Sequence, residues 1–186
     1  MNFRNTPRSW GAISKALHWL IALLIINQWV IASRADNLPL GTAKLQAIAW
    51  HKSFGMTIFA LAIIRLVWRW MNPVPTLDGV TRTWERRLAT FSHVMLYGLI
   101  FAMPLSGWLM SSARNFPVSW FGLYQFPDLV AANKPLYEFM HDLHGALFNA
   151  LACVALLHIA GALKHHFIDK NDVLKRMLPF GGARND

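Results

Sequence analysis

The chain alternates between long apolar stretches and shorter polar segments. Four apolar stretches run at about 13–33, 48–70, 88–111 and 144–167. An α-helix rises about 1.5 Å per residue, so roughly 20 apolar residues cross the roughly 30 Å hydrocarbon core of a bilayer. The pattern therefore predicts an all-α fold, an integral membrane four-helix bundle that forms a single transmembrane domain over residues 1–186.

The polar segments carry turn and interface residues. Asn72-Pro-Val-Pro-Thr ends the second predicted helix, and Thr83-Trp-Glu-Arg-Arg is typical of a short amphipathic lead-in to the third. Proline removes one helical hydrogen bond, so Pro104 predicts a kink within the third helix. Residues 112–143, with an aromatic-rich run at 120–126, are expected to form a structured loop against the bilayer.

Composition and charge support this topology. Hydrophobic residues make up 55% of the chain and charged residues 15%, which is too apolar for an ordinary soluble domain. The formal net charge of +9 is concentrated in residues 4–15, 65–87 and 164–184. Fewer cations fall on the other side, where Arg34, Lys44, Arg114 and Lys134 lie. The positive-inside rule then places both termini in the cytoplasm, and the basic charge gives no reason to expect a nucleic-acid partner.

The first apolar stretch also has to be compared with a secretory signal, because basic residues precede it. It contains His18, Asn27 and Gln28, and no small-residue cleavage site follows it. We therefore interpret it as a retained membrane helix. Cys153 is the only cysteine, so the chain cannot form an internal disulfide.

Two histidines lie in the fourth apolar stretch, where an imidazole is costly and tends to mark function. His144 and His158 are fourteen residues apart. At about 100° per residue they differ by about 40° from four full turns, so both rings face nearly the same side of the helix, roughly 21 Å apart along it. From the topology, His51 lies at the depth of His144, and either His18 or His93 lies at the depth of His158.

Paired neutral imidazoles at two depths are suited to hold two bis-histidyl haems, one near each membrane face. Such an arrangement would carry electrons across the bilayer. A zinc or copper site would need ligands that converge on one point. A proton relay is disfavoured because no aspartate or glutamate accompanies the histidines within the predicted spans.

The histidines and their neighbours also resemble a known family. The chain is similar to the bacterial cytochrome b561 family at Leu17-His18-Trp19-Leu20, Trp50-His51, His144, His158, Leu163-Lys-His-His-Phe and Leu178-Pro179. The resemblance implies a multi-pass cytochrome of the bacterial inner membrane with two b-type haems. It also implies that His18 and His158 ligate the inner haem iron, and His51 and His144 the outer one.

The family includes superoxide oxidases, and the resemblance therefore implies oxidation of superoxide at the periplasmic face and reduction of ubiquinone. Lys52, beside His51, is the candidate for steering the superoxide anion. Arg65 and Arg69 are candidates for pairing with haem propionates. His93 and His165 are candidates for a quinone or proton port.

Two other functions remain open from the sequence. A cytochrome b subunit of a larger respiratory complex, of the hydrogenase or formate dehydrogenase type, would use the 112–143 segment to dock its partner. A small transporter or membrane scaffold would use the histidines along a transport pathway. The expected partners are membrane lipid, ubiquinone and superoxide, and a homo-oligomer is compatible with the sequence.

Overall fold

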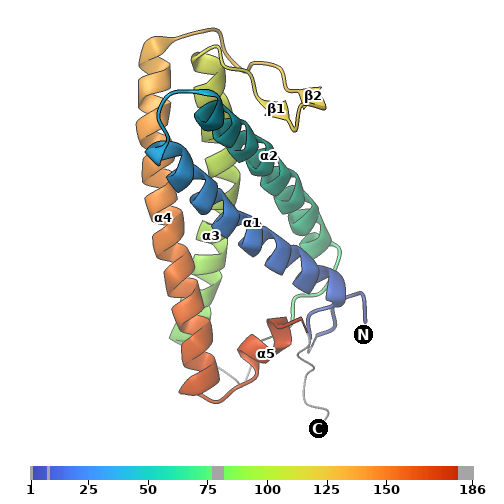
Figure 1. The fold of residues 1–186 in the computed structure, drawn as a ribbon. Coiled ribbons are helices and arrows are strands. Elements are labelled where there is room, and N and C mark those ends of the chain that lie inside the picture. The colour runs from blue at the N-terminus through green and yellow to red at the C-terminus, as the bar shows by residue number, and fades with distance from the viewer. Residues whose placement is uncertain (1, 8, 77–81, 180–186) are drawn as a thin grey trace. The chain divides into compact units, whose positions relative to one another are not determined.

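The computed structural model describes residues 2–7, 9–76 and 82–179, and these residues are mostly helical (Figure 1). The four long helices are α1 (Ala12–Asn37), α2 (Thr42–Trp70), α3 (Thr83–Ala113) and α4 (Lys134–Phe167). Each is long and apolar enough to cross a membrane, as the sequence predicted. A two-residue antiparallel hairpin, β1 (Ser119–Trp120) and β2 (Tyr124–Gln125), lies between α3 and α4, and a short α5 (Val173–Met177) follows α4. Arg8 and Arg184, two cations of the predicted inner side, lie outside the described residues.

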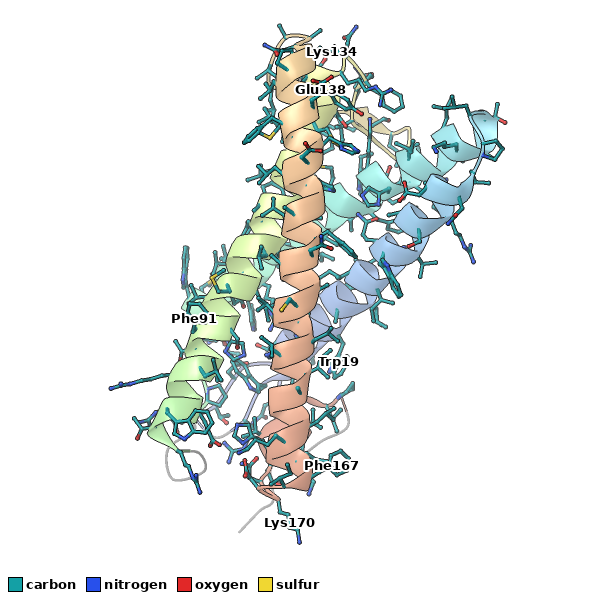
Figure 2. The ribbon with its side chains drawn as sticks, turned by 90° about the vertical axis from the view of Figure 1, so that its left-hand side faces the viewer. Trp19, Phe91, Lys134, Glu138, Phe167 and Lys170 are labelled. Atoms are coloured by element: carbon teal, nitrogen blue, oxygen red, sulfur yellow. The ribbon has the colours of Figure 1, made fainter. Side chains whose placement is uncertain are left out.

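The start of α4 differs from the predicted stretch, because the helix begins at Lys134 rather than near residue 144. The Asn133 side chain accepts a hydrogen bond from the Leu136 backbone N–H at 3.0 Å, which caps the helix, and Pro135 is suited to a first turn. Lys134 and Glu138 form an exposed pair one turn apart at this end of α4 (Figure 2). Apolar patterning misses this extension because charged residues interrupt its apolar ones.

The start of α3 also precedes the predicted stretch. The amphipathic lead-in is the first part of the helix itself, which begins at Thr83. The Glu85 carboxylate accepts a hydrogen bond from the Arg82 backbone N–H at 3.1 Å and so satisfies a free donor at the helix start. The helix then continues through Pro104 to Ala113.

The chain divides into two compact units, and each unit takes a segment from all four long helices. The first unit comprises Met1–Leu20, Ile63–Gly98 and Leu151–Asp186. The second unit comprises Ile21–Ala62 and Leu99–Ala150. His18, His93 and His158 fall in the first unit, whereas His51 and His144 fall in the second.

The first unit is held by polar contacts around the beginning of α1. The Asn5 side-chain oxygen accepts hydrogen bonds from the Gly11 N–H and the Ser14 hydroxyl, at 2.9 and 2.7 Å, and the Asn5 amide donates to the Pro73 carbonyl. A Cβ at Gly11 would overlap the preceding backbone, so this close turn requires glycine. The Trp68 indole donates to the Ser14 hydroxyl at 3.1 Å. These bonds join the start of α1 to the end of α2.

The second unit includes the segment between α3 and α4, which was predicted to be a structured loop. Its hairpin packs on α2 through hydrogen bonds: the Ser53 hydroxyl donates to the Ser119 carbonyl and accepts from the Phe121 N–H, both at 3.0 Å. The Trp120 indole donates to the Thr57 hydroxyl at 3.0 Å. The segment is therefore ordered by bonds to a long helix.

Large apolar side chains remain exposed along the long helices. Leu156 and Leu157 of α4 are 67% and 65% exposed, and Phe91 of α3 is 62% exposed. Figure 2 shows Phe91 pointing away from the neighbouring helices. Such contiguous apolar surfaces are covered by lipid tails in membrane proteins.

Candidate functional site

The second unit brings together one histidine from α2 and one from α4. The ring centroids of His51 and His144 lie 6.3 Å apart, with an angle of 76° between the ring planes. An imidazole nitrogen binds a metal ion at about 2.0 Å. Because the ring centroid lies about 1.1–1.2 Å behind that nitrogen, two axial imidazoles on one iron have centroids about 6.2–6.4 Å apart. The observed separation fits one iron between the two rings.

The first unit contains a second pair with the same geometry. The ring centroids of His18 on α1 and His158 on α4 lie 6.4 Å apart, also at 76°. His93 on α3, the other candidate partner of His158, has its centroid only 5.1 Å away. That distance is too short for an iron with an axial imidazole on each side. The geometry therefore favours His18 as the partner of His158 and places His93 beside the pair.

The orientation of His144 is set by α3. Its Nδ1 lies 2.8 Å from the Ser106 hydroxyl, which itself lies 2.8 Å from the Met103 carbonyl. A hydroxyl has one proton, and the carbonyl can only accept, so the proton of Ser106 is used there and Nδ1–H of His144 is the donor to Ser106. The lone pair is then on Nε2, the arrangement found for metal-ligating histidines. A Cβ at Gly107 would lie 3.2 Å from the His144 ring, so glycine leaves room for it.

His51 has a different environment. The Gln28 amide of α1 donates to the His51 backbone carbonyl at 2.9 Å. Among the described residues, neither the His51 Nδ1 atom nor the Gln28 side-chain oxygen has a hydrogen-bond partner, although both are buried. Two buried polar atoms without partners thus lie on residues that are already joined by a hydrogen bond from the Gln28 side chain to the His51 backbone. Spacing along the sequence gave no signal for Gln28, Ser106 or Gly107 as neighbours of the histidines.

The predicted propionate partners lie in the first unit. The Arg65 guanidinium donates to the Tyr97 hydroxyl at 3.1 Å and to the Ser14 carbonyl at 3.2 Å. Arg69 lies over the Tyr97 ring, with 5.9 Å between the guanidinium carbon and the ring centroid. Two guanidinium N–H groups of Arg65, Nε–H and Nη1–H, are therefore already bonded to protein acceptors. Arg69 makes no hydrogen bond or ion pair within the part of the chain that the structure describes.

Lys52, the predicted steering residue, is bound to the loop after α3. Its ammonium donates to the Phe116 and Pro117 carbonyls, at 2.9 and 3.3 Å, and lies 3.5 Å from the centroid of the Phe116 ring. The side chain therefore holds the loop against α2 and also places a positive charge there. Arg114 of the same unit donates to the Tyr137 hydroxyl at 2.8 Å.

His165, a predicted port residue, belongs to a network of charged side chains in the first unit. Its Nδ1 lies 2.7 Å from an Asp169 carboxylate oxygen. The Lys164 ammonium donates to the same carboxylate, at 2.8 Å, and to Glu85 at the start of α3. Ligand atoms of Glu85, His165 and Asp169 lie within 4.8 Å of one another. Because the Lys164 ammonium already donates to both carboxylates, we interpret the cluster as a tie between α3 and α4.

This tie predicts a pH-dependent contribution to stability. The hydrogen bond from Lys164 holds the pKa of Asp169 below its ordinary value of 3.8. A carboxyl group with a lowered pKa stabilises the folded state above the unfolded pKa, and this contribution is lost as the pH falls through the folded pKa. We expect Asp169→Asn to lower the melting temperature in detergent at neutral pH, and the difference to decrease as the pH falls below 3.8 and to disappear below the lowered pKa of the folded state. Asp142→Asn, at an exposed carboxylate near His141, is the control and should leave the melting temperature unchanged at neutral pH.

Two pairs of imidazoles at an iron-bridging separation, on helices able to cross a membrane, define a class of protein: a membrane cytochrome that holds its haem between helices. The family model of the prokaryotic cytochrome b561 matches residues 9–180, and the chain belongs to this family. It is therefore a multi-pass protein of the bacterial inner membrane that transfers electrons across it, and membership implies b-type haem.

Three similar proteins agree with this assignment. Cytochrome b561 homolog 2 of Escherichia coli (strain K12) is 36% identical over 179 residues, which cover 96% of this chain and 95% of the relative. Cytochrome b561 homolog 1 of the same organism is 25% identical over 88% of this chain and 93% of the relative. A protein named probable superoxide oxidase CybB, from Yersinia pestis, is 27% identical over 92% of this chain and 97% of the relative.

The bond between Ser106 and His144 gives a testable prediction. Removal of a partner that orients a metal-ligating histidine typically lowers metal-group affinity by about 10–100-fold. We expect Ser106→Ala to weaken retention of haem at the His51–His144 pair by an amount in this range, measured as haem loss to an apo-haemoprotein acceptor. Ser92→Ala is the matched control, because the Ser92 hydroxyl donates to the Ala89 carbonyl of its own helix and makes no bond to a histidine within the described residues. Equal haem loss from the two variants would contradict a role for Ser106.

Proposed function

We propose that the chain binds two b-type haems, one between His18 and His158 and one between His51 and His144, and that it oxidises superoxide and reduces ubiquinone. The observation that carries the proposal is the centroid separation of the two pairs, 6.4 and 6.3 Å, which fits two axial imidazoles on one iron in each unit. Similarity to the probable superoxide oxidase of Yersinia pestis supports the choice of electron donor.

The reaction balances as two one-electron oxidations and one two-electron reduction. Two superoxide anions each give up one electron and leave as dioxygen. One ubiquinone takes the two electrons and two protons from the cytoplasm and becomes ubiquinol. Haem iron supplies reversible one-electron chemistry, which converts single electrons from superoxide into the pair that the quinone requires.

The chain's own residues position this chemistry. α4 is one uninterrupted helix from Lys134 to Phe167 and contributes a ligand to each pair (Figure 1). The Ser106 hydroxyl fixes the tautomer of His144 so that Nε2 is free to bind iron. Arg65 has guanidinium N–H groups beyond the two that bond to protein, and these are suited to a haem propionate.

The proposed orientation has both termini in the cytoplasm and the His51–His144 pair toward the periplasm. The support is the concentration of positive charge in residues 4–15, 65–87 and 164–184, together with the positive-inside rule. In this orientation Lys52 and Arg114 face the periplasm. Fixed positive charges raise the local concentration of an anionic substrate such as superoxide and thus its rate of capture.

The test uses the purified holoprotein. Superoxide generated enzymatically should reduce its haem, superoxide dismutase should prevent this reduction, and added decylubiquinone should reoxidise the haem. Failure of superoxide to reduce the haem would rule out the proposed donor. Copurification of a stoichiometric iron–sulfur partner would instead indicate the subunit of a larger respiratory complex.

A further inference from the structure

A cavity of about 270 Å³ lies in the first unit, between the end of α2 and the start of α3. Leu66 and Arg69 of α2 line it, together with Val94 and three polar residues of α3: Thr90, His93 and Tyr97. Val94 is 63% exposed on an apolar helix, so the cavity opens toward the lipid tails. A binding site at this place is reached from the membrane.

Two polar groups of the cavity, the Tyr97 hydroxyl and the Arg69 guanidinium, carry hydrogens that have no acceptor among the described residues, whereas the Thr90 hydroxyl donates to the Arg86 carbonyl at 3.0 Å. The Tyr97 hydroxyl accepts a hydrogen bond from Arg65, and no described residue accepts the proton of this hydroxyl. The Arg69 guanidinium lies over the Tyr97 ring and makes no hydrogen bond or ion pair with a described residue. Donors without acceptors are costly in an apolar environment, so they are expected to face a ligand that offers acceptors.

We propose that this cavity binds the head group of the quinone, an inference that rests on the proposed function. A quinone has two carbonyl oxygens, which only accept hydrogen bonds, on a flat six-membered ring with an apolar tail. The Tyr97 hydroxyl and the Arg69 guanidinium supply donors to these oxygens, and the opening beside Val94 leaves the tail in the lipid. An apolar cavity of about 150 Å³ holds benzene, so the larger volume here accommodates a substituted ring.

The cavity also lies close to an electron source. His93, which lines it, has its ring centroid 5.1 Å from that of His158, a proposed ligand of the inner haem. This contact gives His93 a role that fits its geometry, since the ring is too close to His158 to share an iron with it. His93 thus both lines the cavity and contacts His158.

The direct test is photolabelling of the full-length holoprotein in lipid nanodiscs with an azido-ubiquinone, followed by mapping of the labelled peptides. The label should be found between Leu66 and Tyr97 on α2 and α3, and decylubiquinone should compete with it. Competition by anionic phospholipid but not by decylubiquinone would show that the cavity is a lipid site and would overturn the proposal. So would labelling confined to other helices.

Variants locate the binding groups. Tyr97→Phe and Arg69→Gln should each raise the concentration of decylubiquinone needed for half-maximal competition by about tenfold, the loss of one good hydrogen bond. Arg87→Gln, an exposed cation of α3 outside the cavity, is the matched control for Arg69→Gln and should change nothing. Unchanged competition in both test variants would overturn the proposal.

Haem content and superoxide reactivity separate this inference from the proposed function. Haem content should be unchanged in both variants. A loss of haem in Arg69→Gln would assign Arg69 to a propionate, and the competition measured with Tyr97→Phe would then decide whether the cavity binds quinone. If superoxide fails to reduce the haem while the cavity is still labelled, the quinone site stands and the proposed donor is wrong. If superoxide reduces the haem and quinone reoxidises it, but the label lies elsewhere, the site is wrong and the reaction stands.

Discussion

Replacement of His18 with alanine is expected to remove one of two haems, whereas replacement of His93 leaves both. The two imidazoles lie near the same partner, His158, but only His18 is at a separation that accommodates an iron between the rings: 6.4 Å, compared with 5.1 Å for His93. Loss of an axial ligand should lower electron delivery to quinone more than the roughly 10–100-fold effect of removing a residue that only orients a ligand. The measurement is haem per chain together with the rate of quinone-dependent reoxidation.

The outcome of this pair of variants distinguishes two ligand sets. Loss of haem in His93→Ala and retention in His18→Ala would show that α3, rather than α1, supplies the inner ligand. His93→Ala is itself the matched control, because it removes a buried imidazole from the same unit without removing a proposed ligand. A decrease in quinone affinity in His93→Ala, with both haems present, would agree with the site between α2 and α3.

The second large effect is expected at the outer pair. His144→Ala should eliminate the haem between His51 and His144 and with it the reduction of any haem by superoxide, since that pair is the proposed point of electron entry. The inner haem should remain and should still be reduced by dithionite. The measurement is the absorbance change at the haem bands after addition of superoxide and then of dithionite.

His141→Ala is the control for this experiment. His141 lies three residues from His144 on α4, but its ring is exposed and its Nδ1 is 3.4 Å from Asp142. The variant should keep both haems and the full response to superoxide. If His144→Ala still allowed superoxide to reduce the remaining haem, electron entry through the outer pair would be wrong.

The sequence predicted the four long helices because each contains an apolar stretch long enough to cross the bilayer. Recognising such a stretch does not require knowing how the helices pack against one another. The prediction missed the first ten residues of α4, since Lys134, Glu138 and Asp142 are polar and the cap at Asn133 is a local feature. Periodicity also placed His144 and His158 on one side of a helix. Depth alone left His18 and His93 as equal partners of His158, because choosing between them requires the distances between rings.

The surroundings of the histidines were less accessible from the sequence. Ser106 is one of several serines in α3, and the spacing of residues does not say which face of α3 meets His144. The network at His165 joins Glu85 to Lys164, which are 79 positions apart in the chain. Contacts of this kind depend on how helices pack, and a single sequence carries no direct signal for them.

The measurement that tests the central claim most directly is the ratio of haem b to protein chain, determined by the pyridine haemochrome method and quantitative amino-acid analysis. Ligation by both pairs predicts two haems per chain in the unmodified protein, one in His144→Ala, one in His158→Ala, and none when both substitutions are combined. A single haem per chain in the unmodified protein, or two haems in either single variant, would contradict it.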